Sequence, residues 1–199
     1  YARLNELGLT GLTVPAEYGG AGQDLVAAIA AIEELAAAGP CPGGPFIHTA
    51  FYGGMNIAEN GSAEQKARFL PALARGELFF AYGLSEPDVG GDLASVATRA
   101  RLDGDEVVID GAKRWCTGAD WSHYIYTLVR SGPAEDRYRN LSFVLIPTDA
   151  PGVRMQDIHH ANLRYTASQD VYFDGVRVPV ANIVGGPMMW NQGWKLLAG

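Results

Sequence analysis

The stretch from residue 81 to residue 119 decides how the whole chain is read. Residues 82–92 read YGLSEPDVGGD, and residues 113–118 read KRWCTG. Each cluster combines hydroxyl groups, glycine and one large aromatic side chain, and a predicted hairpin separates the two. If the hairpin brings both clusters to the same edge of a sheet, they can face a flat, polar, phosphate-bearing ligand.

The hairpin belongs to a run of predicted strands. Residues 96–102 and 106–114 flank Asp103-Gly104-Asp105, a turn sequence that tolerates the positive φ of tight hairpins. Other strands are predicted over residues 79–84, 124–130, 141–147, 153–158, 170–173 and 176–178. Their regular spacing predicts an all-β sandwich or barrel domain over residues 78–184.

Residues 1–77 instead predict an N-terminal helical domain. Asp24 can cap a helix that ends near residue 39, and residues 46–59 read as a second, buried helix. Ser62 and Gln65 fit a capping box that begins a third helix. The apolar positions expected to face the core are Leu25, Ile29, Ile32 and Leu35 in the first helix and Phe69, Leu70 and Leu73 in the third.

Residues 185–199 predict a linker and the first turns of a truncated C-terminal helical domain. Gly185-Gly186-Pro187 interrupts the strands, and residues 189–197 return to helix-compatible spacing. The predicted fold class is therefore α+β and multidomain, with an all-α domain, an all-β sandwich or barrel domain and the start of a helical bundle.

Composition narrows the function. The 199 residues are 48% hydrophobic and 19% charged, as in ordinary globular proteins, and the net charge is -7. With no basic run, nucleic acid and anionic membranes are not expected partners. The chain also lacks an apolar stretch long enough to span a bilayer and a signal-peptide core, which predicts a soluble, cytoplasmic protein.

Cysteine and histidine give no sign of a metal centre or a disulfide scaffold. Cys41 and Cys116 are far apart in the sequence, so neither a disulfide framework nor a cysteine zinc site is expected. His159 and His160 are adjacent, and neighbouring strand residues point to opposite faces, so no metal site is expected there either.

The order and spacing of several short motifs resemble those of the acyl-CoA dehydrogenase family across essentially the whole chain. The matching landmarks are Glu6-Leu7-Gly8-Leu9, Val14-Pro15-Ala16-Glu17-Tyr18-Gly19-Gly20, Glu33-Glu34-Leu35-Ala36, Asn60-Gly61-Ser62 with Gln65-Lys66, Ser85-Glu86-Pro87 with Gly90, Asp110-Gly111-Ala112-Lys113, and residues 173–179. The family has an N-terminal helical domain, a middle β domain and a C-terminal four-helix bundle, which agrees with the element pattern read from this chain.

The resemblance implies that the two clusters bind FAD. Tyr82, Leu84 and Ser85 would line the flavin, with the Leu84 backbone and the Ser85 hydroxyl near its pyrimidine edge. Trp115 would pack against the isoalloxazine ring, and the Thr117 hydroxyl would point toward its N5 region. Hydroxyl and amide donors suit this position because a flavin that accepts hydride gains negative charge.

Other residues are assigned by the same resemblance or left open. Gly90 and Gly91 would let the backbone approach the cofactor pyrophosphate and the substrate thioester, although many family members have Ser at the position of Gly91. His48 is a candidate substrate contact, but a lone histidine on an apolar face is more often a core residue. Glu86 more often pairs locally than reacts, and Arg164, a candidate for a CoA phosphate, has no decided role.

The reaction implied is α,β-dehydrogenation of an acyl-CoA thioester in lipid catabolism, with an electron-transferring flavoprotein as acceptor and a homo- or hetero-oligomer of two or four subunits. The family's catalytic Glu lies in the C-terminal bundle, so no catalytic residue is expected in this fragment, which alone should be inactive. Two alternatives stay open. One is an oxygen-reactive flavoenzyme of the same fold, either an oxidase or a monooxygenase; the other is a non-catalytic subunit.

Overall fold

The structure is a computed structural model that describes residues 2–39, 44, 46–160 and 167–198. Contacts divide the chain into two compact units, Tyr1–Phe80 and Ala81–Gly199. The sequence predicts the first boundary after residue 77 and a second after residue 184; in the structure, residues 185–198 belong to the second unit.

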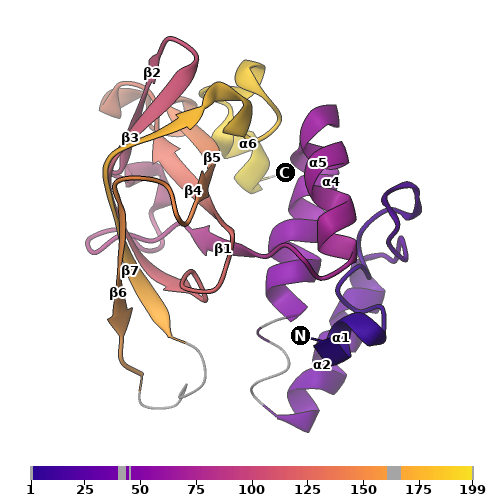
Figure 1. Ribbon diagram of the computed structural model, residues 1–199. Helices are drawn as coiled ribbons and strands as arrows, with labels where there is room; N and C mark the ends of the chain where they lie inside the picture. Colours follow the sequence, from indigo (N-terminus) through magenta and orange to yellow (C-terminus); the bar gives the residue numbers. More distant parts are fainter. Residues whose placement is uncertain (1, 40–43, 45, 161–166, 199) are drawn as a thin grey trace. The chain divides into compact units, whose positions relative to one another are not determined.

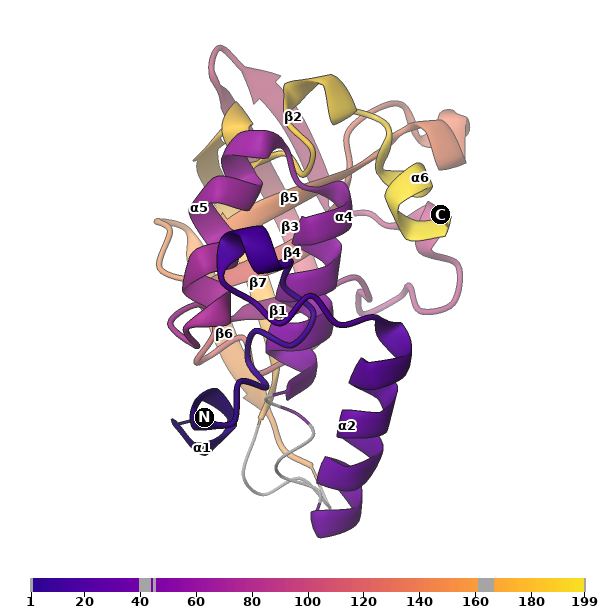
Figure 2. The ribbon, with the colours of Figure 1, turned by 90° about the vertical axis from the view of Figure 1, so that its right-hand side faces the viewer.

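The first unit is helical (Figures 1 and 2). Its elements are α1 (Ala2–Glu6), a 3₁₀ turn (Ala16–Tyr18), α2 (Leu25–Ala38), a π-helix (His48–Met55), α4 (Asn56–Asn60) and α5 (Ala63–Ala74). The segment predicted as one helix over residues 46–59 therefore contains a π-helical stretch that continues into α4. Figure 2 shows α4 and α5 side by side, and these two helices are in contact.

Both predicted helix caps are confirmed. The Asp24 side chain accepts a hydrogen bond of 3.0 Å from the backbone N–H of Ala27 at the start of α2. At α5, the Gln65 N–H donates to Ser62 Oγ at 3.2 Å, and the Ser62 N–H donates to Gln65 Oε1 at 3.1 Å. Local side-chain bonds of this kind satisfy backbone donors that the helix itself leaves free, so they fix where each helix begins.

The core-facing prediction is right for α5 and partly wrong for α2. Phe69, Leu70 and Leu73 are buried as predicted. In α2, however, Leu25 and Ile29 are exposed, at 47% and 44%, and the face that packs on the core contains Ala28, Ala31, Ile32 and Leu35. These four positions form a regular i, i+3, i+4, i+7 stripe, and small alanine side chains let the helix approach its neighbours closely.

The second unit is one seven-stranded sheet with short helical turns (Figure 1). The strands are β1 (Phe80–Gly83), β2 (Arg99–Asp103), β3 (Glu106–Thr117), β4 (Tyr124–Arg130), β5 (Leu141–Pro147), β6 (Val153–Ile158) and β7 (Ser168–Pro179). Their order is β1-β4-β2-β3-β7-β6, and β5 pairs with β4. The 3₁₀ turns cover Leu93–Ser95, Ala134–Arg139, Val180–Asn182 and Pro187–Met189, and α6 covers Gly193–Ala198.

The predicted hairpin is confirmed, but two predicted strands are a single strand. β2 and β3 pair antiparallel from Arg99↔Asp110 to Asp103↔Glu106, and Gly104 takes the turn with φ 62°. The segments 170–173 and 176–178 form one continuous β7, because β3 keeps pairing with it through a register shift between Ile109 and Gly111. A β-bulge lets a strand bend here without ending.

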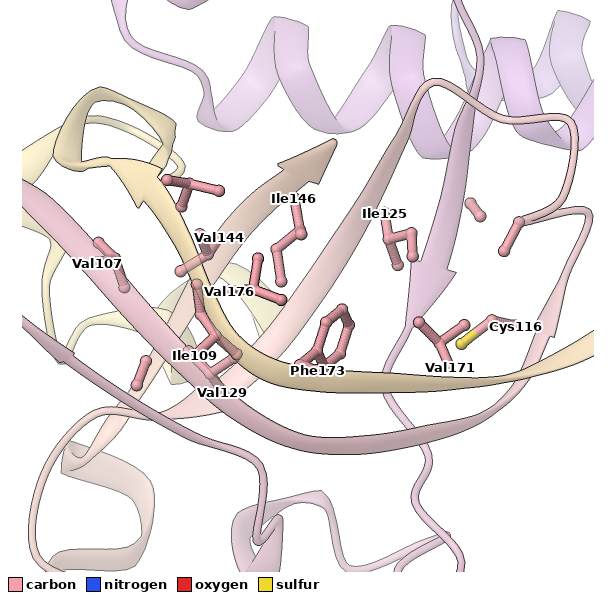
Figure 3. Packing of buried hydrophobic residues seen from close by; sticks show 14 of the residues in the cluster. Val107, Ile109, Cys116, Ile125, Val129, Val144, Ile146, Val171, Phe173 and Val176 are labelled. Carbon is pink, nitrogen blue, oxygen red and sulfur yellow. The ribbon is translucent and has the colours of Figure 1, made fainter. Parts of the chain in front are cut away.

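A continuous apolar core lines the inner face of the sheet (Figure 3). Figure 3 shows side chains from β3, β4, β5 and β7 meeting there, with Cys116 and Val171 together at one end. Successive strand residues point to opposite faces, so the neighbours of these core residues lie on the outer face. Among the described helices of both units, none has the length and apolar character needed to cross a membrane.

Candidate functional site

The two clusters of the opening stretch lie side by side in the second unit. The backbone N–H of Arg114 in β3 donates a hydrogen bond of 2.8 Å to the carbonyl of Ser85, in the loop after β1. A residue from the YGLSEPDVGGD stretch and one from KRWCTG are thus joined through their backbones. The sequence prediction that a hairpin brings the two clusters together is confirmed.

A bulge in β3 turns Trp115 outward. Lys113 pairs with Val171, and Cys116 pairs with Gln169, so three steps on β3 oppose two on β7. Strict alternation would put residues 113 and 115 on one face; the extra residue instead places Cys116 in the core and leaves Trp115 52% exposed. Trp115 has φ 63°, a left-handed conformation that costs a bulky residue free energy.

Two neighbouring side chains lie close to the Trp115 indole. The Arg114 guanidinium lies 5.1 Å from the centroid of the indole ring, and the ring of His160 lies 6.1 Å from it at an angle of 39°. His160 Nε2 accepts a hydrogen bond of 3.1 Å from the Ser168 N–H, which fixes the imidazole. The position of His160 was not predictable from the sequence, because it meets Trp115 across 45 positions of the chain.

The Thr117 hydroxyl shares a hydrogen bond of 2.6 Å with the Ser168 hydroxyl, its register partner on β7. A hydroxyl has one proton to donate, so one of the two donates to the other and the second keeps its proton free for an outside acceptor. Ser168 is a second hydroxyl that sequence reasoning missed, because the strand was predicted to begin at residue 170, whereas β7 begins at Ser168.

A buried ion pair fixes the base of the site. Lys113 Nζ lies 2.8 Å from Glu86 Oε1 and donates to the Leu84 carbonyl at 3.0 Å, with side chains 0% and 5% exposed. Burial lowers the pKa of Lys113, and Glu86 opposes that shift. Burial also acts to raise the pKa of Glu86, but Lys113 and backbone donors outweigh it and hold the pKa below its usual range.

Glu86 therefore has a structural place, in agreement with the sequence interpretation. Its carboxylate accepts the backbone N–H groups of Ala97 at 2.6 Å and Thr98 at 2.9 Å in addition to Lys113. Gly83 makes room for the pair, since a Cβ there would lie 2.9 Å from Ile125 Cγ2 and 3.5 Å from the Lys113 stem. The loop after β1 is thus tied to both β2 and β3.

The loop that contains Gly90 and Gly91 is held at its two ends and open between them. Glu86 and Val89 form a β-bridge, and Asp92 accepts hydrogen bonds from Ser95 Oγ at 2.6 Å and Arg137 Nη2 at 2.7 Å. A Cβ built on Gly90 or Gly91 meets nothing within 4 Å, and neither residue has a positive φ. The space beside this backbone is therefore free.

The remaining residues of the predicted cofactor set lie in β1 and at the start of the loop after it. The ring of Tyr82 stacks on that of Tyr126, with centroids 5.2 Å apart and an interplanar angle of 10°. Leu84 and Ser85 are half-buried, and their carbonyls are occupied by Lys113 and Arg114. Within the part of the chain that the structure describes, the Ser85 hydroxyl has no hydrogen-bond partner.

His48 belongs to the first unit and has the features of a core residue. It is 3% exposed, its Nδ1 lies 2.7 Å from the Phe80 carbonyl, and its ring meets Tyr52 edge-on. Burial lowers its pKa from 6.5 to about 4, despite the opposing hydrogen bond to Phe80, so the ring is neutral at physiological pH. Contact of His48 with a substrate stays a prediction.

The other candidates do not form a site. Among the described residues, no three His, Cys, Asp or Glu side chains are grouped so that they could hold a metal ion. Burial raises the pKa of the Cys116 thiol to about 12. Cys41 and Arg164 lie outside the described residues, so the interpretations that rest on them are not assessed.

The donor set fits a flavin in chemical character. An exposed, flat indole offers a stacking surface, while the Ser85 hydroxyl and the Thr117–Ser168 pair offer protons to an acceptor. A flavin has the matching features, a planar ring system edged by carbonyl and ring-nitrogen acceptors. Trp115 and Thr117 come from β3, Ser168 from β7 and Ser85 from the loop after β1, and the Lys113–Glu86 pair and the Arg114–Ser85 bond join that loop to β3.

Two family profiles cover nearly all of the chain. Residues 1–77 match the acyl-CoA dehydrogenase N-terminal domain, and residues 81–176 match the acyl-CoA dehydrogenase middle domain. The boundary between the two matches falls close to the division between the two structural units.

Individual relatives agree with these matches. Acyl-CoA dehydrogenase FadE26 of Mycobacterium tuberculosis is 36% identical over 98% of this chain and 48% of its own length. Among solved structures, the ChsE4-ChsE5 complex from Mycobacterium tuberculosis is 36% identical with a TM-score of 0.82, covering 98% of this chain and 49% of that one. Acyl-CoA dehydrogenase from Geobacillus kaustophilus is 28% identical with a TM-score of 0.90, covering 98% and 51%.

The chain spans about half the length of the curated relatives it matches. Within that half, the two profile matches fall on the two structural units, one on each. The chain belongs to the acyl-CoA dehydrogenase family.

Proposed function

We propose that the protein containing this chain binds FAD through the second unit and catalyses α,β-dehydrogenation of an acyl-CoA thioester. The observation that supports this most strongly is the bulge in β3. It exposes a strained Trp115 beside a hydroxyl pair, and it does so next to the Ser85 loop. Strained backbone persists where the surrounding structure over-determines it, and such positions cluster at functional sites.

FAD, when bound, would supply the ring that accepts a hydride from the β carbon of the substrate. The chain's own residues would bind and orient that ring. Trp115 would stack on it and exclude water from one face, and the Ser85 hydroxyl would donate to its pyrimidine edge. The free proton of the Thr117–Ser168 pair would stabilise the negative charge that the ring gains.

No side chain described here is proposed as the base that removes the α proton. Glu86 is buried, and its carboxylate accepts hydrogen bonds from Lys113 and two backbone N–H groups; these donors hold its pKa below the usual range and make it a poor base. The open backbone at Gly90 and Gly91 is the place where we expect the thioester end of the substrate and the cofactor pyrophosphate to pass.

The test is FAD binding by the full-length protein, followed through flavin absorbance and fluorescence. We expect Trp115→Ala to weaken FAD binding about tenfold, because a lost aromatic stacking contact is worth about 1 kcal/mol or more. The matched control is Tyr138→Ala, which removes an aromatic side chain of similar exposure, 49%, from the same unit. A full-length protein that stays colourless with added FAD would overturn the proposal, as would equal affinity in the Trp115 variant and the wild type.

The runner-up function is a non-catalytic subunit that pairs with a related chain, and the absent hydroxyl at Gly91 is the observation that favours it. The ChsE4-ChsE5 complex is named for two different chains, and its similarity covers 98% of this chain and 49% of that one. We propose assembly with a second copy or a related chain, with an electron-transferring flavoprotein as the electron acceptor. Rapid reoxidation in air after reduction by substrate would instead indicate the oxygen-reactive alternative.

A further inference from the structure

The outer face of the sheet in the second unit contains a hollow that the flavin site does not use. It has a volume of about 360 Å³, and its polar lining comprises Arg99 and Arg101 of β2, Asp110 of β3, and Arg130, Ser131 and Gly132 at the end of β4. Ala100, Ile109 and Val129, the chain neighbours of these residues, point into the core. The charged side chains therefore project from the opposite face, into the hollow.

Two arginines stand side by side in this hollow. Arg99 is the register partner of Arg130 on the parallel strand β4 and of Asp110 on the antiparallel strand β3. Neighbouring strands lie about 4.8 Å apart, so the bases of the two arginine side chains are close. Like charges placed opposite each other on adjacent strands repel, and the repulsion is strongest where no counter-charge lies between them.

The protein supplies few partners for these charges. Within residues 2–39, 44, 46–160 and 167–198, neither Arg99 nor Arg130 makes a hydrogen bond or an ion pair through its guanidinium group. Arg101 lies 3.5 Å from Asp103, whose same oxygen accepts Arg177 at 2.8 Å. Asp110 Oδ1 accepts the Gly175 N–H at 2.9 Å.

The hollow is positively charged, whereas the chain as a whole is negatively charged. Three guanidinium groups face one carboxylate, which leaves a surplus of two positive charges in a chain whose net charge is -7. A guanidinium group can donate two parallel hydrogen bonds to phosphate oxygens. A phosphate bound between two arginines would also supply the negative charge that no carboxylate of the described residues supplies there. A dianion matches both the surplus charge and the fork geometry of two adjacent arginines.

We propose that this hollow binds a phosphate dianion, which accepts hydrogen bonds from Arg99 and Arg130 together. The phosphate is either inorganic or the terminal group of a phosphomonoester. Ser131 takes no part, because its hydroxyl is already shared with the Asn140 carbonyl, Ser142 and Asn191. The site uses none of the residues assigned to FAD, so it does not depend on the proposed function.

The experiment follows the thermal unfolding of the full-length protein as inorganic phosphate is added, with ionic strength held constant by sodium chloride. Phosphate should raise the midpoint of the wild type, and Arg99→Gln or Arg130→Gln should each weaken the apparent affinity about tenfold, since a hydrogen bond to a charged group is lost. The double variant should show no phosphate response. Arg154→Gln is the control; it removes an exposed arginine from β6 of the same sheet and should respond as the wild type does.

Two further comparisons sharpen the result. Without phosphate and at low ionic strength, Arg99→Gln should be at least as stable as the wild type, because it removes a repulsion. Adenosine 3′-phosphate in place of inorganic phosphate separates the sources: similar affinities indicate free phosphate, and a nucleotide that binds much more tightly indicates a phosphomonoester. A phosphate response that is equal in the wild type and the double variant, or that sodium chloride alone reproduces, would overturn the proposal.

Discussion

Lys113 and Trp115 are two residues apart in β3, yet the first side chain is buried and the second is exposed. Lys113, a charged residue, is fully buried and paired with Glu86 at 2.8 Å. Trp115, a large apolar residue, is 52% exposed with a strained φ of 63°. Judged by residue type alone, the tryptophan would be expected inside and the lysine outside.

The difference shows how the site is built. The buried pair joins the loop after β1 to β3 through hydrogen bonds to Leu84 and to the backbone at Ala97 and Thr98. A rigid base of this kind can hold the next residues in a conformation that they would not adopt alone. The buried Lys113–Glu86 pair anchors the loop, whereas Trp115 and the Gly90–Gly91 loop provide the exposed, open surface.

The largest expected effect follows from breaking the buried pair. Lys113→Met leaves the Glu86 carboxylate buried without its cation, and we expect the free energy of unfolding to fall by about 3–5 kcal/mol. Urea denaturation of the full-length protein measures this loss. In the double variant Lys113→Met/Glu86→Gln the uncompensated charge is gone, so part of the stability should return.

The control for this prediction is an ion pair of similar length on the surface. Arg75 and Glu77 lie 2.7 Å apart, but their side chains are 59% and 56% exposed. Arg75→Met should change stability little, since solvent screens the pair. Equal losses in the two variants would show that the Lys113–Glu86 pair has no special part in holding the site.

A smaller effect is expected from another buried titratable side chain, His48. Its folded-state pKa of about 4 lies below the unfolded value of 6.5, so the unfolded chain binds more protons between these two pH values. His48 therefore contributes full stability above pH 6.5 and loses about 3 kcal/mol as the pH falls to 4. Urea denaturation at several pH values measures this decline.

The decline should be reduced in His48→Asn, which cannot gain a proton in this range. His123→Gln, an exposed histidine in the second unit, should keep the pH dependence of the wild type. If the free energies of unfolding of the wild type and of His48→Asn fall equally between pH 6.5 and 4, the buried imidazole is not the source of the acid sensitivity.

The sequence predicts the features that depend on local chemistry. The caps at Asp24 and Ser62 and the turn at Gly104 involve residues only two or three positions apart, so their spacing is visible in the chain itself. The buried face of α5 is also predicted, because large apolar residues mark it.

Features that depend on distant pairing are not visible in this way. Alanines dominate α2, so several stripes of similar hydrophobicity compete, and tertiary packing selects the one through Ala28 rather than Ile29. The bulge at Trp115 depends on the register with β7, and Ser168 meets Thr117 across 51 positions. Of the site, residue types were predictable from the sequence, whereas their shared geometry required the sheet.

The smallest effect is expected from a substitution in the open Gly90–Gly91 loop. Gly91→Ser should change the free energy of unfolding by less than about 0.5 kcal/mol, because a Cβ there meets nothing within 4 Å and the backbone is unstrained. If acyl-CoA passes this loop, the added hydroxyl should tighten its binding about threefold, as one further hydrogen bond would. Isothermal titration calorimetry with the full-length protein measures the affinity.

Gly83→Ser is the matched control, since it makes the same change at the closely packed end of β1, just before the loop. A Cβ at Gly83 lies 2.9 Å from Ile125 Cγ2 and 3.3 Å from Thr127 Oγ1, so the side chain has no space and stability should fall by about 1–3 kcal/mol. Comparing the two serine variants therefore tests whether Gly83 is closely packed while Gly91 is open. If Gly91→Ser destabilises the protein as much as Gly83→Ser does, the tip is packed as well, and the contrast between the rigid base and the open surface fails.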